Sequence, residues 1–207
     1  MRGVEDMTVA ENREGTRYLL RDNTAVVVRQ IRPEDKRRLQ DGLKHLSEQS
    51  RYFRFLAPIQ KLSSEQLRHL TELDHVNHEA WAAFDKEGED QQVLGVARYI
   101  QLDDEPGVAE AAVAVIDSHH NRGMATLLIG KLIISAIENG IRMFRGFFHS
   151  DNKVVHRIFE DVDAGIVREE GFILRADTPL PADPLSIEDP RMNKIAKKVA
   201  SALSSKA

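Results

Sequence analysis

The segment with the most chemical content in this 207-residue chain runs from His120 to Thr126. A strand-like stretch precedes it and a long apolar helical pattern follows it, which predicts a loop at a helix start. Gly123 lets the backbone approach a bulky anion, and Ala125 is small enough for a phosphate to lie against the first turn. Unpaired amides and the positive end of the helix dipole favour negative charge there. The loop is therefore predicted to bind phosphate through His120, Asn121, Arg122, Gly123, Met124, Ala125 and Thr126.

This loop matches neither of the two common nucleotide-binding motifs. No Gly-Lys-Ser/Thr follows it, as a P-loop requires, and it has one glycine where a dinucleotide fingerprint needs three. Arg122 adds a formal positive charge beside the amides. A lone glycine before a helix is more often structural than ligand-binding, so the interpretation depends on the surrounding elements.

Glu110 is the candidate proton acceptor. It stands in the stretch from Ala109 to Ile116, which otherwise contains only alanine, valine and isoleucine. A carboxylate facing an apolar interior is a stronger base than one in water, and it can take a proton from an amine. Strand alternation leaves a second interpretation open, in which Glu110 faces solvent.

The elements that must position these residues alternate between strand and helix patterns. The expected strands cover residues 25–31, 78–85, 92–100, 109–116, 141–148, 166–168 and 172–176. The expected helices cover residues 32–46, 51–56, 63–73, 123–138 and 152–162. This order predicts an α+β or α/β fold with a mixed, mostly antiparallel sheet flanked by helices.

Composition separates the chain into three expected parts. Residues 1–22 are polar and indicate a flexible leader, residues 23–181 form the folded domain, and residues 182–207 combine a proline-rich link with a basic helix or tail. The basic stripe of Lys194, Lys197 and Lys198 leaves partner or nucleic-acid binding open, although such stripes are usually solvated faces.

Composition also excludes several classes of chemistry. The chain has no cysteine, which excludes disulfides, thiolate nucleophiles and iron–sulfur clusters and agrees with a reducing cytoplasm. A net charge of -4 and 6% aromatic residues argue against nucleic-acid binding. No apolar run reaches the roughly 18 residues of a membrane span, and no signal peptide is indicated. The histidines lack a His-Glu-x-x-His frame, so no metal is expected.

With its flanking elements, the frame His120-Asn121-Arg122-Gly123-Met124-Ala125 resembles the Gln/Arg-x-x-Gly-x-Gly/Ala fingerprint of the GNAT superfamily of N-acetyltransferases. The resemblance covers about Val26 to Leu180, and His120 departs from the usual first residue. The stretch Ala109-Glu110-Ala111-Ala112-Val113 is similar to a strand in the catalytic domain of bacterial protein lysine acetyltransferases. Further similarity to those domains lies in Arg51 to Phe55, Leu62-Ser63 and Leu73-Asp74-His75.

The resemblance implies that acetyl-CoA is the co-substrate and that a primary amine, in a small molecule or a protein lysine, is the acceptor in a ternary complex. Pantetheine would pair with the exposed backbone of Val113 and Val115, where their strand splays from the next one. Asn152 would contact the cofactor arm, or cap its own helix, or do both. Glu110 matches an acidic position of the lysine acetyltransferase domains.

Two features keep an alternative open. Many family members carry a tyrosine that protonates the leaving thiolate, but the matching residue is Phe159, which leaves His156 as a less favoured acid. A non-catalytic acyl-CoA sensor or interaction module with the same fold therefore remains the alternative. The aromatic run from Arg51 to Phe55 would be either a substrate-side lid or plain packing. A homodimer is compatible with the sequence.

Overall fold

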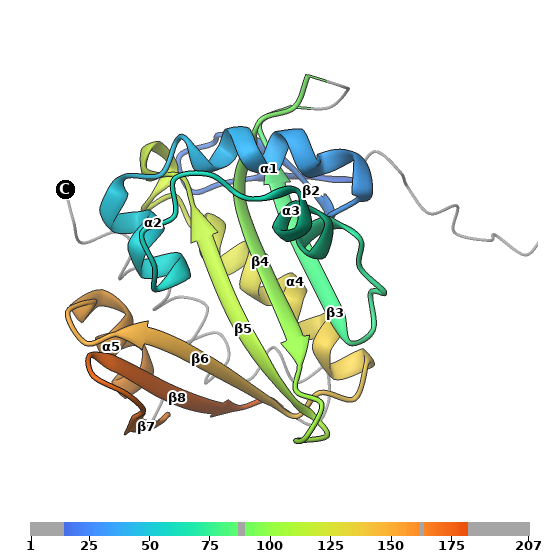
Figure 1. The fold of residues 1–207 in the computed structure, drawn as a ribbon. Helices are drawn as coiled ribbons and strands as arrows, with labels where there is room; N and C mark the ends of the chain where they lie inside the picture. The colour runs from blue at the N-terminus through green and yellow to red at the C-terminus, as the bar shows by residue number, and fades with distance from the viewer. Residues whose placement is uncertain (1–14, 87–89, 162–163, 182–207) are drawn as a thin grey trace, which may run out of the picture.

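The computed structural model describes residues 15–86, 90–161 and 164–181. Its centre is one open, mixed sheet of eight strands in the order β1-β2-β3-β4-β5-β6-β8-β7 (Figure 1). The strands are β1 (Thr16–Leu19), β2 (Ala25–Gln30), β3 (His78–Phe84), β4 (Val93–Gln101), β5 (Val108–Val115), β6 (Met143–His149), β7 (Gly165–Arg168) and β8 (Ile173–Pro179). Among these strands only β5 and β6 pair in parallel, so the predicted mixed, mostly antiparallel sheet is confirmed.

Five α-helices flank the described sheet. They are α1 (Lys36–Leu43), α2 (Glu48–Phe55), α3 (Ser64–Thr71), α4 (Met124–Glu138) and α5 (Lys153–Asp161). Short 3-10 turns, η1 (Pro33–Asp35) and η2 (Asp117–His119), precede α1 and follow β5. None of the helices in residues 15–86, 90–161 and 164–181 has the length and apolar character needed to cross a membrane.

The first strand corrects one prediction. Thr16–Leu19 lies in the segment expected to be a loose leader, but it pairs with β2 along its whole length. Leu20, only 6% exposed, then anchors the β1–β2 turn in the core. The strand is too short to show a pattern by itself, and pairing with β2 stabilises it. Residues 1–14 and 182–207, including the lysine stripe, lie outside the described residues, as do residues 87–89 and 162–163.

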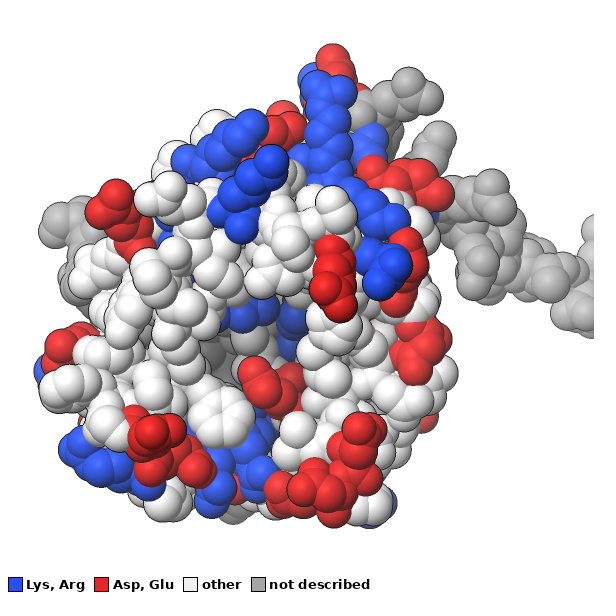
Figure 2. Space-filling view, viewed as in Figure 1, with Lys and Arg blue, Asp and Glu red and all other residues white. Residues whose placement is uncertain are grey.

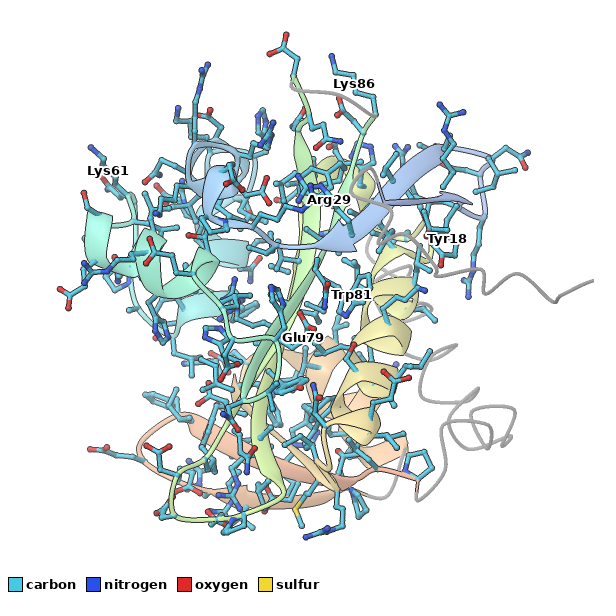
Figure 3. The ribbon with its side chains drawn as sticks, turned by 90° about the vertical axis from the view of Figure 1, so that its right-hand side faces the viewer. Tyr18, Arg29, Lys61, Glu79, Trp81 and Lys86 are labelled. Atoms are coloured by element: carbon cyan, nitrogen blue, oxygen red, sulfur yellow. The ribbon has the colours of Figure 1, made fainter. Side chains whose placement is uncertain are left out.

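Helix α4 lies against one face of the sheet, and α1, α2 and α3 lie against the other (Figures 1 and 3). One stripe of α4 is buried at a spacing of four residues: Met124, Leu128, Leu132 and Ala136 are each at most 1% exposed. Burial of each leucine side chain contributes roughly 1.5–3 kcal/mol. Trp81 of β3 points toward α4, where its indole nitrogen donates to Ser135 Oγ at 2.9 Å. These contacts hold the start of α4 at the end of β5.

Two helices of the opposite face, α2 and α3, begin at side-chain caps. Ser63 Oγ accepts from the Gln66 amide at 3.1 Å, and the Gln66 side chain accepts from the Ser63 amide at 2.8 Å, which forms a capping box at the start of α3. At the start of α2, Ser47 Oγ accepts from the amide of Ser50 at 3.1 Å. The two caps satisfy orphan amides and set where each helix starts above β4 and β5.

Strands β5 and β6 diverge after a short parallel contact. Their register covers only Val108 with Met143, Ala109 with Phe144 and Glu110 with Arg145. Beyond these pairs β5 continues to Val115 and β6 continues to His149, but the two strands no longer pair with each other. Figure 1 shows the two strands opening apart from this point. The predicted splay is confirmed, and it exposes one backbone edge of β5.

Candidate active site

Alternate residues of β5 turn their backbone N–H and C=O groups toward the opening between β5 and β6, called the splay. The Ile116 amide donates to the Leu94 carbonyl of β4 at 2.8 Å, so even-numbered residues of β5 bond toward β4. The odd-numbered residues Val113 and Val115 therefore turn their N–H and C=O groups toward the splay. Their side chains pack in the core shared with α4. This is the backbone arrangement expected for an extended polar ligand along β5.

His120 ties the loop to the end of β5. Its Nε2 lies 2.8 Å from the carbonyl oxygen of Val115. A carbonyl only accepts hydrogen bonds, so Nε2 carries the proton and donates it. The Val115 carbonyl is thus already engaged by the loop, and Val113 lies deeper in the splay. The predicted site residue His120 therefore holds the loop against the end of β5 through this hydrogen bond.

The loop backbone forms a concave turn before α4. Asn121 and Gly123 both lie in the left-handed region, with φ values of 71° and 87°. The Leu127 amide makes the first bond of α4 to Gly123 O at 3.1 Å. The amides of Met124 and Ala125 precede that bond and have no acceptor within the helix. This geometry fits an anion at the helix start.

The first side chains of α4 point away from the loop. Met124 and Ala125 are 1% and 2% exposed and lie in the core, whereas Thr126 is half-buried. Met124 reaches toward Gly95 of β4, where a Cβ would lie 3.1 Å from its sulfur. These two residues can therefore serve a phosphate through backbone amides, while their side chains fix the helix to the sheet.

The Arg122 guanidinium is not directed at the amides at the start of α4, as the sequence predicted, because it is paired elsewhere. Its guanidinium donates to Ser118 O at 2.8 Å and lies 3.0 Å from Asp22 Oδ2. Arg21 stands beside the glycine instead, since a Cβ on Gly123 would lie 3.4 Å from Arg21 Cγ and Nε. Within the described part of the chain Arg21 makes no ion pair. Sequence reasoning missed Arg21 because the folded turn brings it to the loop from about 100 positions away in the chain.

Asn152 caps α5. Its Oδ1 accepts from the amide of Val155 at 3.3 Å, so the capping interpretation is confirmed and contact with a cofactor stays a prediction. Phe159 on the same helix is part of the packing: its ring stacks on Phe148 at 5.2 Å between centroids. His156, the alternative acid, lies 3.3 Å from Glu160.

Glu110 lies on the opposite face of the sheet from α4, on the wall of a cavity of about 440 Å³. Figure 2 shows the hollow at the middle of this face, with basic side chains inside it and acidic ones on its wall. Glu110 itself is exposed to solvent. The expected burial among apolar side chains is therefore wrong, because β4 and the helices leave this part of β5 open. Its position on the cavity wall still places a carboxylate beside any ligand there.

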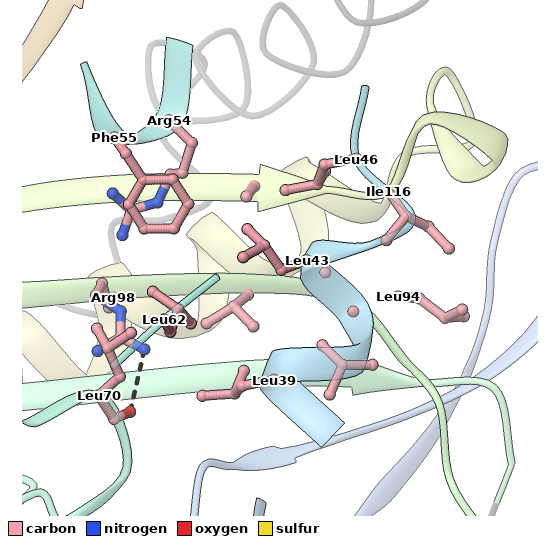
Figure 4. Close-up of a pocket in the computed structure, with 15 residues that line it drawn as sticks. Leu39, Leu43, Leu46, Arg54, Phe55, Leu62, Leu70, Leu94, Arg98 and Ile116 are labelled. Carbon is pink, nitrogen blue, oxygen red and sulfur yellow. Dashed lines mark hydrogen bonds between the residues drawn. The ribbon is translucent and has the colours of Figure 1, made fainter. Parts of the chain in front are cut away.

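The cavity lies between β4, β5 and the helices α2 and α3. Its lining consists of Arg54, Phe55, Leu62, Glu65, Gln66, His69, Leu70, Arg98, Ile100, Glu110 and Ala112. It adjoins a smaller apolar pocket of about 70 Å³ beneath α1, and Arg54 and Arg98 line both (Figure 4). No residue of the loop from Asp117 to Gly123 lines either space. The cavity and the loop before α4 are therefore separate places on the chain, connected by β5.

Two arginines on the cavity wall, and a histidine that contacts one of them, have lowered pKa values. Burial, with the nearby Arg54 guanidinium, lowers the pKa of Arg98 to about 9. Burial also lowers the pKa of Arg54, against the attraction of Glu110. Burial and the Arg98 charge lower the pKa of His78 to about 4. His78 is therefore neutral at pH near 7, and its Nε2 accepts from Arg98 at 3.0 Å.

Comparison with known proteins agrees with this geometry. Residues 44–162 match the acetyltransferase (GNAT) family. The chain is 30% identical over 154 residues to Acetyltransferase Pat of Mycolicibacterium smegmatis, covering 74% of this chain and 45% of that protein. It is 29% identical to Acetyltransferase PA5475 of Pseudomonas aeruginosa, covering 76% of this chain and 80% of that protein. The chain thus spans less than half the length of the first relative.

A solved structure shows the same fold. The GNAT domain of S. lividans PAT superposes with a TM-score of 0.70 at 28% sequence identity, covering 80% of this chain and 96% of that chain. The family match covers more than half of the sequence and includes the splayed strand, the loop and the start of α5. The chain belongs to the acetyltransferase (GNAT) family.

Proposed function

We propose that the protein moves an acetyl group from acetyl-CoA to a primary amine while both are bound in a ternary complex. The observation that carries this proposal is the course of β5. This strand ends at the phosphate loop, turns the Val113 backbone into the splay, and places Glu110 on the wall of the cavity. A donor lying along β5 would therefore lead from the loop toward an acceptor in the cavity.

Groups of this chain suit both the pyrophosphate and the pantetheine arm of acetyl-CoA. The amides of Met124 and Ala125, the left-handed Gly123 and the neighbouring Arg21 suit a pyrophosphate. The Val113 backbone suits the amides of pantetheine, and Asn152 at the start of α5 lies at the end of the splayed strand β6. Bound acetyl-CoA supplies an acyl group activated as a thioester.

Glu110 has the proton-transfer role in this proposal. An amine is protonated near neutral pH and attacks only as the free base, so the site needs a proton acceptor. The Glu110 carboxylate takes the proton directly or through water. Phe159 has no proton to give to the departing sulfur, but a thiol with a pKa of about 8.5 does not require a dedicated acid.

The first experiment measures binding and turnover separately. We expect acetyl-CoA to bind and free CoA to be released with an acceptor panel that contains small amines and lysine peptides. Glu110→Gln should lower turnover roughly 100- to 1,000-fold without changing the affinity for acetyl-CoA. The matched control is Glu138→Gln at the exposed end of α4. Absence of acetyl-CoA binding at millimolar concentration would overturn the proposal.

A non-catalytic acyl-CoA sensor is the second candidate function. Two observations favour it: Phe159 is packed on Phe148, and Glu110 is exposed to solvent. A sensor would bind acetyl-CoA without releasing CoA, and Glu110→Gln would change neither binding nor any partner response. A large loss of turnover in that variant decides for the enzyme. A protein lysine as acceptor, a cytoplasmic location and a homodimer remain predictions.

A further inference from the structure

Among the residues that the structure describes, one buried arginine lacks an acidic partner. Arg29, Arg98 and Arg145 are 6%, 5% and 9% exposed. Arg29 makes two hydrogen bonds to Asp35, at 2.7 and 2.8 Å. Arg145 pairs with both Glu105 and Asp177. Arg98 makes no ion pair with any residue that the structure describes.

The two hydrogen bonds that Arg98 makes within the described residues are both to neutral groups. Its Nη2 donates to the Leu70 carbonyl at 3.2 Å, and its Nη1 donates to His78 Nε2 at 3.0 Å. These bonds orient the guanidinium at the cavity, as Figure 4 shows for Arg98 and Leu70. A buried charge without a counterion is costly to a fold. Because the Arg98 guanidinium lies on a cavity wall, an anion from outside the chain can serve as its counterion.

Arg54 adds a second positive charge to the same space. It comes from α2, lines both the large cavity and its apolar extension, and forms no ion pair within the described residues. Its guanidinium carbon lies 5.0 Å from the centre of the Phe55 ring, which leaves its N–H groups to the cavity. Two guanidinium groups from different elements thus converge on one space, which suits a carboxylate because each can donate two bonds.

The remaining charged groups of the cavity lie apart from this pair. Glu65 is exposed in the first turn of α3, and His69 is exposed with its ring 5.0 Å from that of His78. Glu110 attracts Arg54 but makes no ion pair with it in the described structure. The cavity therefore has a positive interior and a separate carboxylate on its wall.

The register of the sheet places Arg98 and Glu110 close together on one face. Arg98 is opposite Ala112 on β5, and Glu110 is two residues before Ala112 on the same face. The Cα atoms of such diagonal cross-strand neighbours lie about 7–8 Å apart. The side chain between them on β5, Ala112, is small. A ligand that contacts both Arg98 and Glu110 would carry opposite charges at its two ends.

We propose that the acceptor is an amine that also carries a carboxylate, which binds to Arg98 and Arg54 while the amine faces Glu110. This deepens the proposed acetyl transfer and rests on it for the role of the amine. In the reaction the free-base amine nitrogen bonds to the acyl carbon, the carbon–sulfur bond breaks, CoA leaves as its thiolate, and the proton lost by nitrogen passes to Glu110. The carboxylate is unchanged and serves for recognition.

Acceptor pairs that differ only in the negative charge test this proposal. The first pair is 5-aminopentanoate and pentylamine, and the second is a peptide with a C-terminal lysine and the same peptide as its amide. The carboxylate member should have a KM lower by roughly 10- to 100-fold. A preference in the first pair alone identifies a small-molecule acceptor, and one in the peptides identifies a protein end. Equal KM values within both pairs would overturn the proposal.

Variants of Arg54 test whether the preference for acceptors with a carboxylate arises in the cavity. Arg54→Gln should abolish the difference within each pair, and Arg54→Lys should keep part of it. Arg51→Gln, one turn earlier on α2 and outside the lining, should leave the difference intact and serves as the control. Thermal unfolding of each variant confirms that it is folded. A full preference retained in folded Arg54→Gln would contradict the assignment.

Binding of pentanoate, a carboxylate without an amine, separates this proposal from the proposed function. Calorimetric titration should show pentanoate binding to the wild-type chain and at least tenfold weaker binding to Arg54→Gln. If pentanoate binds in this way but no amine is acetylated, the anion site is supported and acetyl transfer is contradicted. If neutral amines are acetylated while pentanoate does not bind, acetyl transfer is supported and the anion site is overturned.

Discussion

The imidazole Nε2 of His120 lies 2.8 Å from the carbonyl oxygen of Val115, so the loop before α4 is hydrogen-bonded to the last residue of β5. This bond connects the two ends of the turn between β5 and α4. It gives a structural reason for a histidine where the family fingerprint has glutamine or arginine. All three side chains can donate a hydrogen bond, and the position requires a donor.

Removal of that donor should weaken acetyl-CoA binding. We expect His120→Ala to raise the Kd for acetyl-CoA about fivefold, the loss of one hydrogen bond worth about 1 kcal/mol. His120→Gln should bind nearly as well as the wild type, because its amide can donate to Val115 O. Isothermal titration with acetyl-CoA measures both. An unchanged Kd for the alanine variant would show that the bond does not shape the loop.

Gly123 should not tolerate a side chain. Its φ of 87° lies in the left-handed region, where a Cβ costs roughly 1–2 kcal/mol, and that Cβ would also contact Arg21. We expect Gly123→Ala to lower the free energy of unfolding and to raise the Kd for acetyl-CoA. Urea unfolding and titration check the two effects.

The matched control for this change lies in the same helix. A Cβ added at Gly130 of α4 would meet no described atom within 4 Å, so Gly130→Ala should stabilise the helix by roughly 0.5–1 kcal/mol. Equal behaviour of the two alanine variants would contradict the role assigned to the Gly123 backbone.

Gly146 of β6 makes room for the ring of Phe159. A Cβ at Gly146 would lie 2.8 Å from Phe159 Cζ, so Gly146→Ala should destabilise the protein by about 1–3 kcal/mol. Phe159→Leu in the same chain should recover part of that loss, because the shorter side chain withdraws from the contact. Thermal unfolding of the two single variants and the double variant measures the coupling. Additive effects would show that the contact is not the cause.

Acid should destabilise the protein through His78. The pKa of His78 is lowered by burial and by the Arg98 charge to about 4, while the unfolded chain has a histidine pKa of about 6.5. Between these values the unfolded state binds more protons, so the free energy of unfolding falls as the pH is lowered through this window. At pH near 7 this stability is fully present.

A neutral replacement isolates that contribution. In His78→Gln the amide oxygen can still accept from Arg98, but the side chain does not titrate. Urea unfolding at about pH 7 and about pH 5 should show a smaller loss of stability in this variant than in the wild type. Equal losses in the two proteins would assign the acid sensitivity to other groups.

Local signals in the sequence predicted most of the elements. The Ser63–Gln66 capping box, the β-branched run of β2 and the i+4 apolar stripe of α4 each act over a few residues, so they are visible without tertiary information. The four-residue strand β1 was missed because its stability comes from pairing with β2, which local patterns do not record.

The sequence by itself determined the loop from His120 to Ala125, the helix behind it and the strand that carries Glu110, since each follows from local backbone preference. Only the tertiary structure decided which charges face which site. It paired Arg122 with Asp22, placed Arg21 over Gly123, and brought Arg54 to Arg98 in one cavity. Such partners come from distant segments, and their distances depend on sheet register and helix packing rather than on sequence spacing.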